Sequence, residues 1–201
     1  MPSAHNVLLL LVLLLMDTVS ANSLLFYSSA DNCNISSDHI GCYMHPANIC
    51  CNSHAPFCVN LMLGLGASSA GNDYTQYFVH QDNCHLSKNG GSYCTQGGPN
   101  NAPSCCIDMP PGGGDGATCS GFWLHGDTGA SPHGWKEGTD ANAGCMDPNY
   151  MSYNDGSGVK KIFLPNGTFQ HALDAYNRND FSVLAGYKAL VEVMGNDTDI
   201  V

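Results

Sequence analysis

The sequence predicts disulfide-rich small modules of loops and short β-strands, followed by a C-terminal α+β segment with an amphipathic helix. Three observations lead to this fold class: an apolar leader, a cysteine pattern that occurs twice after it, and periodic apolar residues near the C-terminus. We expect a signal peptide over residues 1–21, cysteine-rich module 1 over 22–81, cysteine-rich module 2 over 82–144 and the C-terminal segment over 145–201.

The first residues have the pattern of a secretory signal. An apolar run from Val7 to Met16 is followed by small residues that end at Ala21, which is typical of a cleavage site. The run is shorter than the roughly 20 residues that a helix needs to cross a bilayer. We therefore expect a secreted, extracellular protein, cleaved after Ala21, with no membrane span.

The charge balance bears on possible partners. The chain has 17 Asp and Glu against 6 Lys and Arg, which gives a formal net charge of −11 at pH 7. Because phosphate groups are bound by clustered cations, we expect no nucleic-acid partner. Three sequons, at Asn34, Asn166 and Asn196, predict glycosylation if the host is eukaryotic.

The cysteines indicate a duplication. The first set is Cys33, Cys42, Cys50, Cys51 and Cys58, and the second is Cys84, Cys94, Cys105, Cys106 and Cys119. In both sets the third and fourth members are adjacent, and both sets open with Asp-Asn-Cys. In both cases 25 residues separate the last cysteine of the set from the next cysteine of the chain. Self-similarity of this kind marks a repeated structural unit.

The two 25-residue segments also align without gaps. Leu61-Met62-Leu63 stands against Phe122-Trp123-Leu124, and Tyr74 stands against Trp135. A short apolar run, a loop of small residues and an aromatic residue therefore recur in the same order.

The cysteines are expected to form disulfides rather than a metal site. His45 and His54 flank the first adjacent pair, but no histidines flank the second pair. Zinc sites also tend to space their cysteines as C-x2-C. Adjacent cysteines suit two bridges that leave in opposite directions. We expect no metal and no other cofactor, and we expect both histidines to be exposed.

The cysteine count is odd. With eleven cysteines, at least one lacks a partner within the chain. Five in each module imply that at least one bridge leaves each module. Cys145 stands where a third unit would begin, and either it pairs with a remaining cysteine or it is available for a disulfide-linked dimer. The sequence does not give the connectivity.

The C-terminal segment contains a strand followed by a turn. Val159 to Leu164 has the composition of a strand, and Pro165-Asn166-Gly167 is a turn signal. These features predict a hairpin that returns into Thr168-Phe169.

Two helices are expected after the turn. A short one covers His171 to Arg178. A longer amphipathic helix covers 181–194, with Asp180 as its N-cap and Gly195 at its end. Its apolar face, which we expect to pack against the modules, consists of Val183, Leu184, Tyr187, Leu190, Val191 and Met194.

One motif suggests catalysis. Asp127-Thr128-Gly129 resembles the active-site triplet of aspartic proteases, in which two aspartates share one proton. The resemblance implies a secreted acid hydrolase that uses Asp127. However, the chain contains one such triplet, and Gly66-Ala67-Ser68 occupies the equivalent place in module 1. The triplet therefore also fits a loop of the repeated unit, and we assign no catalytic residue.

The cysteine order from Cys42 to Cys119 resembles that of the fungal hydrophobins, which implies a surface-active structural protein. The spacing differs, since only six residues follow the first pair, and Cys33, Cys84 and Cys145 are additional. The hevein-type chitin-binding domains share part of this order, but the aromatic cluster that they carry beside the paired cysteines is missing here.

The leading hypothesis is a secreted, non-enzymatic, cysteine-rich protein that binds a surface glycan or an extracellular protein. Tyr74, Trp123 and Trp135 are its candidate contacts, because aromatic faces stack on sugars and anchor protein interfaces. Trp123 lies inside an apolar run and fits a core position equally. The alternatives are the acid hydrolase and the hydrophobin-like structural protein.

Overall fold

The computed structural model describes residues 22–47, 49–64, 74–79, 84, 91–96, 106–108, 118–125 and 144–190. The strands are β1 (Ser23–Tyr27), β2 (His39–Cys42), β3 (Cys50–His54), β4 (Asn60–Gly64), β5 (Tyr74–Val79), β6 (Gly91–Gln96), β7 (Cys106–Asp108), β8 (Thr118–His125), β9 (Cys145–Met146), β10 (Tyr150–Asn154) and β11 (Val159–Phe163). The helices are α2 (Phe169–Asn177) and α3 (Phe181–Leu184). The expected fold is confirmed in its coarse form: short strands, several disulfides and a small C-terminal helical part.

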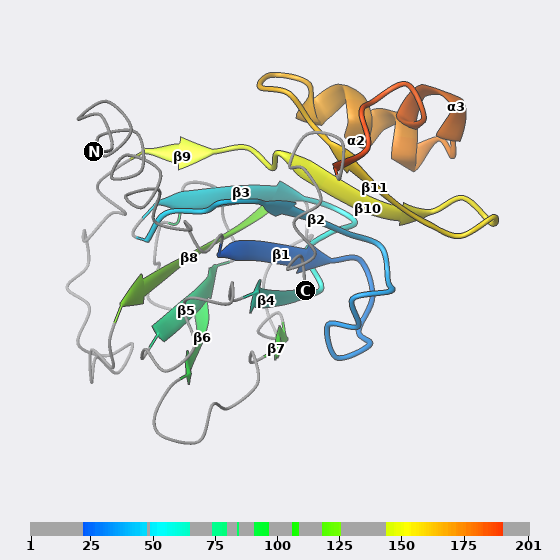
Figure 1. Cartoon of the computed structure of the whole chain (residues 1–201). Coiled ribbons are helices and arrows are strands. Elements are labelled where there is room, and N and C mark those ends of the chain that lie inside the picture. The colour runs from blue at the N-terminus through cyan, green and yellow to red at the C-terminus, as the bar shows by residue number, and fades with distance from the viewer. Residues whose placement is uncertain are drawn as a thin grey trace, which may run out of the picture.

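The strands form two sheets (Figure 1). The first has the order β11-β10-β2-β1-β4-β7, and the second has the order β6-β5-β8-β3-β9. The two sheets share a core in which Phe26 of β1 meets Phe78 of β5 edge to face, with ring centroids 6.1 Å apart. Burying each such side chain contributes about 1.5–3 kcal/mol, so this shared core holds the sheets together.

The centres of the two sheets repeat the same arrangement. In the first sheet β1 lies between β2 and β4, and in the second sheet β5 lies between β8 and β6, with every pair antiparallel. Phe26 pairs with Leu61 across β1 and β4, and Tyr77 pairs with Phe122 across β5 and β8. Tyr77 lies 51 positions after Phe26, and Phe122 lies 61 positions after Leu61. The same offsets relate β1 to β5 and the two 25-residue segments, so the register across these strands is the same in both units.

The strands that carry the adjacent cysteines are exchanged. β7, from the second cysteine set, pairs with β4 in the first sheet. β3, from the first set, pairs with β8 in the second sheet. β5 corresponds to β1 and is counted with the second repeat, although it precedes residue 82. Each sheet therefore combines three strands of one repeat with one strand of the other, so the two repeats interleave.

Disulfides hold this interleaved arrangement. The bridges between described cysteines are Cys33–Cys106, Cys42–Cys51, Cys50–Cys84 and Cys58–Cys119, and Cys94 is disulfide-bonded as well. Three of these four bridges join the first cysteine set to the second. A bridge that closes a long loop restricts the unfolded chain and stabilises the fold by about 2–4 kcal/mol.

The C-terminal segment extends both sheets. β9 pairs in parallel with β3, while β10 and β11 form a hairpin that adds to β2. The predicted strand from Val159 is confirmed as β11. The predicted hairpin into Thr168-Phe169 is wrong, because β11 pairs back with β10 and Phe169 begins α2. The Thr168 carbonyl accepts a hydrogen bond from the Ala172 N–H, which starts the helix after the turn.

The predicted short helix is confirmed as α2, which buries Phe169, Ala172, Leu173 and Ala175. Within 181–194, where one longer helix is predicted, Leu190 is helical and Phe181–Leu184 form the separate short helix α3. Asp180 caps it as expected, since its Oδ1 accepts from the Val183 N–H at 3.4 Å. The chain then runs beside β11, where the Phe163 N–H donates to the Lys188 carbonyl at 2.9 Å. A turn at 185–187 and the pairing of Lys188 and Ala189 with β11 interrupt the predicted helix, and 191–194 lie outside the described residues.

The helical part packs beside the β10–β11 hairpin (Figure 1). Tyr176 of α2 contacts Phe57, with ring centroids 4.9 Å apart, and its hydroxyl donates to Asp38 at 2.7 Å. Among the described residues, no helix is long and apolar enough to cross a membrane.

Candidate functional site

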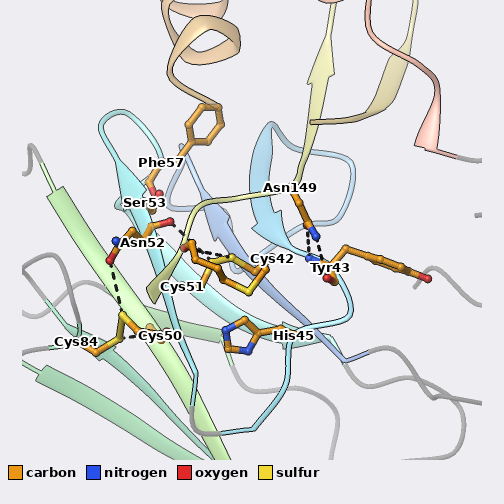
Figure 2. Close-up of a disulfide and its surroundings, with 12 residues drawn as sticks. Cys42, Tyr43, His45, Cys50, Cys51, Asn52, Ser53, Phe57, Cys84 and Asn149 are labelled. Atoms are coloured by element: carbon orange, nitrogen blue, oxygen red, sulfur yellow. Dashed lines mark hydrogen bonds between the residues drawn. A yellow bond between two sulfur atoms is a disulfide. The ribbon is translucent and has the colours of Figure 1, made fainter. Parts of the chain in front are cut away.

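The stretch between β2 and β4 holds the most unusual side-chain cluster of the described chain. β2 ends at Cys42 and β3 begins at Cys50, so the Cys42–Cys51 bridge ties the two strands, which lie in different sheets, directly together. Figure 2 shows the imidazole of His45 beside this bridge. The neighbouring Cys50–Cys84 bridge leaves β3 in another direction, as expected for adjacent cysteines.

His45 is buried, which corrects the expectation that it is exposed. Its side chain is 2% exposed, and neither ring nitrogen has a hydrogen-bond partner. The backbone explains the burial: the His45 N–H donates to the Asn22 carbonyl at 2.8 Å, and the His45 carbonyl accepts from Trp123 Nε1 at 3.1 Å. These two bonds hold the turn after β2 against β1 and β8, so the ring points into the protein.

The cluster consists of Cys42, His45 and Cys51. A ring nitrogen of His45 and the two Sγ atoms lie within 4.8 Å of one another, and all three residues are buried. Burial lowers the pKa of His45 to about 4, so its imidazole is neutral at neutral pH and keeps a lone pair. His54, the second histidine of this stretch, is half-buried and lies against Phe169, with ring centroids 5.7 Å apart.

The loop that carries His45 is tied to the C-terminal segment. The Tyr43 N–H donates to Asn149 Oδ1 at 2.6 Å, and Asn149 Nδ2 donates to the Tyr43 carbonyl at 3.0 Å (Figure 2). Asn149 therefore completes the cluster's support from a distant part of the sequence.

A second buried histidine lies on the other face of the first sheet. His39 packs between Tyr27 and Tyr150, with ring centroids 5.0 Å and 5.8 Å away. Its Nδ1 lies 2.7 Å from the Ser37 carbonyl, so it carries the hydrogen of that bond. Burial lowers the pKa of His39 to about 4, because the charged ring would lose its hydration there.

The predicted aromatic contacts fall into different places. Trp123 is 3% exposed and bonded to the His45 carbonyl, so it occupies the core position that its apolar run also fits. Tyr74 is the first residue of β5. Trp135 lies outside the described residues, as does Asp127.

The strand register brings the ends of three strands, β5, β6 and β8, together at one end of the second sheet. Tyr74 pairs with His125, the last residue of β8, and with Gln96, the last residue of β6. The connection 126–143, which carries Trp135, departs from His125. Tyr74 and His125, where the Trp135 connection begins, are therefore neighbours in the sheet, although His125 lies 51 positions after Tyr74 in the sequence.

Two of the predicted glycosylation sites are described, and both are exposed. Asn34 lies in the β1–β2 connection, where its Oδ1 accepts from the Ser36 N–H at 3.0 Å. Asn166 lies in the turn before α2, and Asn196 is outside the described residues. Cys145 is exposed and lies opposite Cys50 in the backbone pairing of β9 with β3. Its predicted role in a dimer stays a prediction.

The sequence did not reveal the cluster around His45. Its position depends on a turn in which Met44 takes a φ of 54° and on the Asn22 and Trp123 bonds, which join segments far apart in the chain. The spacing of apolar residues within one segment does not predict contacts between distant segments. The one local signal was the placement of a histidine between Cys42 and Cys51.

No family model, curated protein or solved structure matches this chain. A function inferred for it therefore depends on the geometry and chemistry of its own residues.

Proposed function

We propose that this protein is a secreted, non-enzymatic binding protein that holds a neutral extracellular glycan at the end of the second sheet. The observation that carries the proposal is the register that sets Tyr74 beside His125, from which the Trp135 connection departs. Tyr74 and the residue from which the connection carrying Trp135 departs thus lie at the same end of the second sheet.

The chemistry of this region suits a sugar. Aromatic rings stack on the apolar faces of sugar rings, and hydroxyl groups need polar partners around them. The 126–143 connection surrounds Trp135 with Gly, Ser, Thr, Asp, Asn and His, and the 97–105 connection after Gln96 contains two asparagines and a serine. Binding residues concentrate on the connections that a rigid scaffold carries.

The charge favours a neutral ligand. With a formal net charge of −11, the chain repels sulfated or carboxylated polysaccharides. A neutral glycan is bound by stacking and hydrogen bonds, which this repulsion leaves intact.

The scaffold suits an oxidising compartment. Disulfides persist outside the cell and in the secretory pathway, and here they join the two repeats across the molecule. Cleavage after Ala21 would leave Asn22 as the first residue, directly before β1. Glycans at Asn34, Asn166 and Asn196 would cover parts of the surface. Mass loss on enzymatic deglycosylation of the secreted protein checks this part.

The test is sedimentation of the purified secreted protein with insoluble neutral polysaccharides such as chitin, cellulose and β-1,3-glucan. We expect saturable binding to one of them, and we expect Trp135→Ala and Tyr74→Ala each to weaken it about tenfold, equivalent to roughly 1.4 kcal/mol. Val159→Ala is the matched control, because Val159 is 42% exposed and lies on β11 of the other sheet.

Equal binding by wild type and Trp135→Ala would contradict the proposal. Failure of all neutral polysaccharides to bind, with capture of an extracellular protein instead, would reassign the region to a protein partner. Release of soluble sugar or peptide by wild type, abolished in Asp127→Asn, would support the hydrolase alternative.

A further inference from the structure

The cluster of Cys42, His45 and Cys51 has no role in the proposed glycan binding. It brings together one imidazole and two sulfur atoms in a buried place, within 4.8 Å of one another. Both nitrogens of the imidazole lack hydrogen-bond partners, although the side chain is 2% exposed. Leaving a buried polar atom unpaired costs roughly 1–3 kcal/mol, so a group that accepts its lone pair would be stabilised there.

We propose that Cys42, Cys51 and His45 form a redox-dependent copper(I) site. With the bridge closed, the two sulfur atoms are bonded to each other and bind no ion. Opening the bridge creates two thiolates that, with one nitrogen of His45, hold a single Cu(I).

The reaction balances with a thiol reductant. A dithiol gives two electrons and two protons to the Cys42–Cys51 bond, and it leaves as its own cyclic disulfide. The protein then carries two thiols. Binding of Cu(I) releases both thiol protons, so the site holds two thiolates, one neutral imidazole and one monovalent cation. Reoxidation to the disulfide by an added oxidant expels the ion.

The donor set favours copper over harder ions. Thiolates and imidazole select Cu(I) and zinc, whereas calcium and magnesium need oxygen ligands. Structural zinc is almost always four-coordinate, but the cluster offers three donors among the described residues. Cu(I) is stable with fewer ligands than zinc, and burial protects it from oxidation.

The scaffold keeps the three donors close after the bridge opens. Cys42 and Cys51 end and begin strands that are fixed by their own sheets, since β2 pairs with β1 and β10, and β3 pairs with β8 and β9. His45 is held at its backbone by Asn22 and Trp123. The ligands are therefore positioned by bonds that do not involve the disulfide itself.

The experiment uses the full secreted chain after limited reduction with dithiothreitol, removal of the reductant under anaerobic conditions and titration with Cu(I). Alkylation followed by peptide mass spectrometry then identifies the protected cysteines. We expect a single copper ion per chain, protection of Cys42 and Cys51, and alkylation of any cysteine from another opened bridge. X-ray absorption at the copper edge should show two sulfur donors and one nitrogen donor.

His45→Phe should weaken Cu(I) binding by about 100-fold, because even outer-shell partners of metal sites contribute roughly 10–100-fold. His54→Phe is the matched control from the same stretch and should bind as wild type does. Circular dichroism of the oxidised proteins checks that both variants fold. If His45→Phe does not fold, the donor count from X-ray absorption of wild type decides alone.

Three results would overturn the proposal. Cu(I) that protects cysteines of several bridges alike would show non-specific thiolate binding. A donor shell of sulfur alone would exclude His45. Collapse of the fold when the Cys42–Cys51 bridge opens would show that no site persists without it.

Discussion

At the scale of single residues, close approach and burial decide what each position tolerates. Gly41 lies on β2 opposite Leu25 of β1 and Tyr150 of β10. A Cβ at Gly41 would lie 2.5 Å from the Leu24 carbonyl oxygen and 2.7 Å from Tyr150 Cε1. At Gly64 the nearest atom would be 3.6 Å away. The tyrosine ring therefore covers a position that only glycine can occupy.

Gly41→Ala should destabilise the protein by about 1–3 kcal/mol, since overpacking forces strands or rings to shift. For a chain of this size, each kcal/mol lowers Tm by roughly 2–4 °C. Gly64→Ala, on β4 of the same sheet, where an added Cβ would make only ordinary van der Waals contacts, should melt within about 2 °C of wild type. Coinciding melts of the two variants would contradict the close contact.

The buried histidines make stability depend on pH. The pKa values of His39 and His45 are lowered from 6.5 to about 4, so the unfolded chain binds more protons than the folded one between these values. Above pH 6.5 both rings are neutral in the folded and in the unfolded chain, so the free energy of unfolding is at its full value. As the pH falls toward 4, the rings become protonated in the unfolded chain first, and this free energy decreases. Each shift corresponds to about 3 kcal/mol at 1.36 kcal/mol per unit.

We predict that His45→Phe loses less stability than wild type between pH 7 and pH 4.5, as measured by urea unfolding at both values. The exposed His171→Asn is the control and should follow wild type. A variant that replaces His45 and keeps the full acid sensitivity would show that the ring is hydrated in solution.

At the scale of elements, composition and residue spacing predicted the strands and helices that form from interactions within one segment. The strand from Val159 and the helix around His171 follow from composition and spacing, and the structure has both. The helix expected over 181–194 is interrupted after Leu184, because Lys188 and Ala189 pair with β11 instead. An apolar stripe at helical spacing shows that residues face the core, but it does not exclude an extended path along a sheet edge. The turn that buries His45 could not be predicted from local spacing either, because contacts with distant segments of the chain determine it.

The link between Tyr43 and Asn149 connects two such elements. Asn149→Ala should destabilise the protein by roughly 1–3 kcal/mol, because it leaves the N–H and carbonyl of Tyr43 without these partners in a buried place. Asn154→Ala, at the exposed end of β10, serves as the control. Thermal melts at pH 7 compare the two, and an equal Tm in both variants would mean that water replaces the Asn149 amide.

At the scale of the whole molecule, the two repeats are interleaved rather than placed side by side. The shared order of neighbours and the equal register of β1–β4 and β5–β8 support the duplication inferred from the cysteines. The exchange of β3 and β7 could not be read from the sequence, since both partners offer similar apolar strands and nothing local distinguishes a strand's own sheet from the other one. Each repeat therefore needs the other to complete its sheet.

The bridges follow the same exchange. The first cysteine of each set bonds to one member of the other set's adjacent pair, and the last cysteines of the two sets bond to each other. Exchanging the sets reproduces this scheme, except that Cys33 takes the second member, Cys106, whereas Cys84 takes the first, Cys50. A sandwich of two complete modules would instead allow most bridges to close within one module.

Peptide mapping of the unreduced secreted protein tests this interleaved architecture most directly. Alkylation at acid pH prevents exchange, and mass spectrometry then identifies the linked peptides. We predict linked peptides for Cys33–Cys106, Cys50–Cys84 and Cys58–Cys119, all of which cross from one repeat to the other. Bridges confined to residues 22–81 and 82–144 would contradict this architecture, because β3 and β7 would then belong to the sheets of their own repeats.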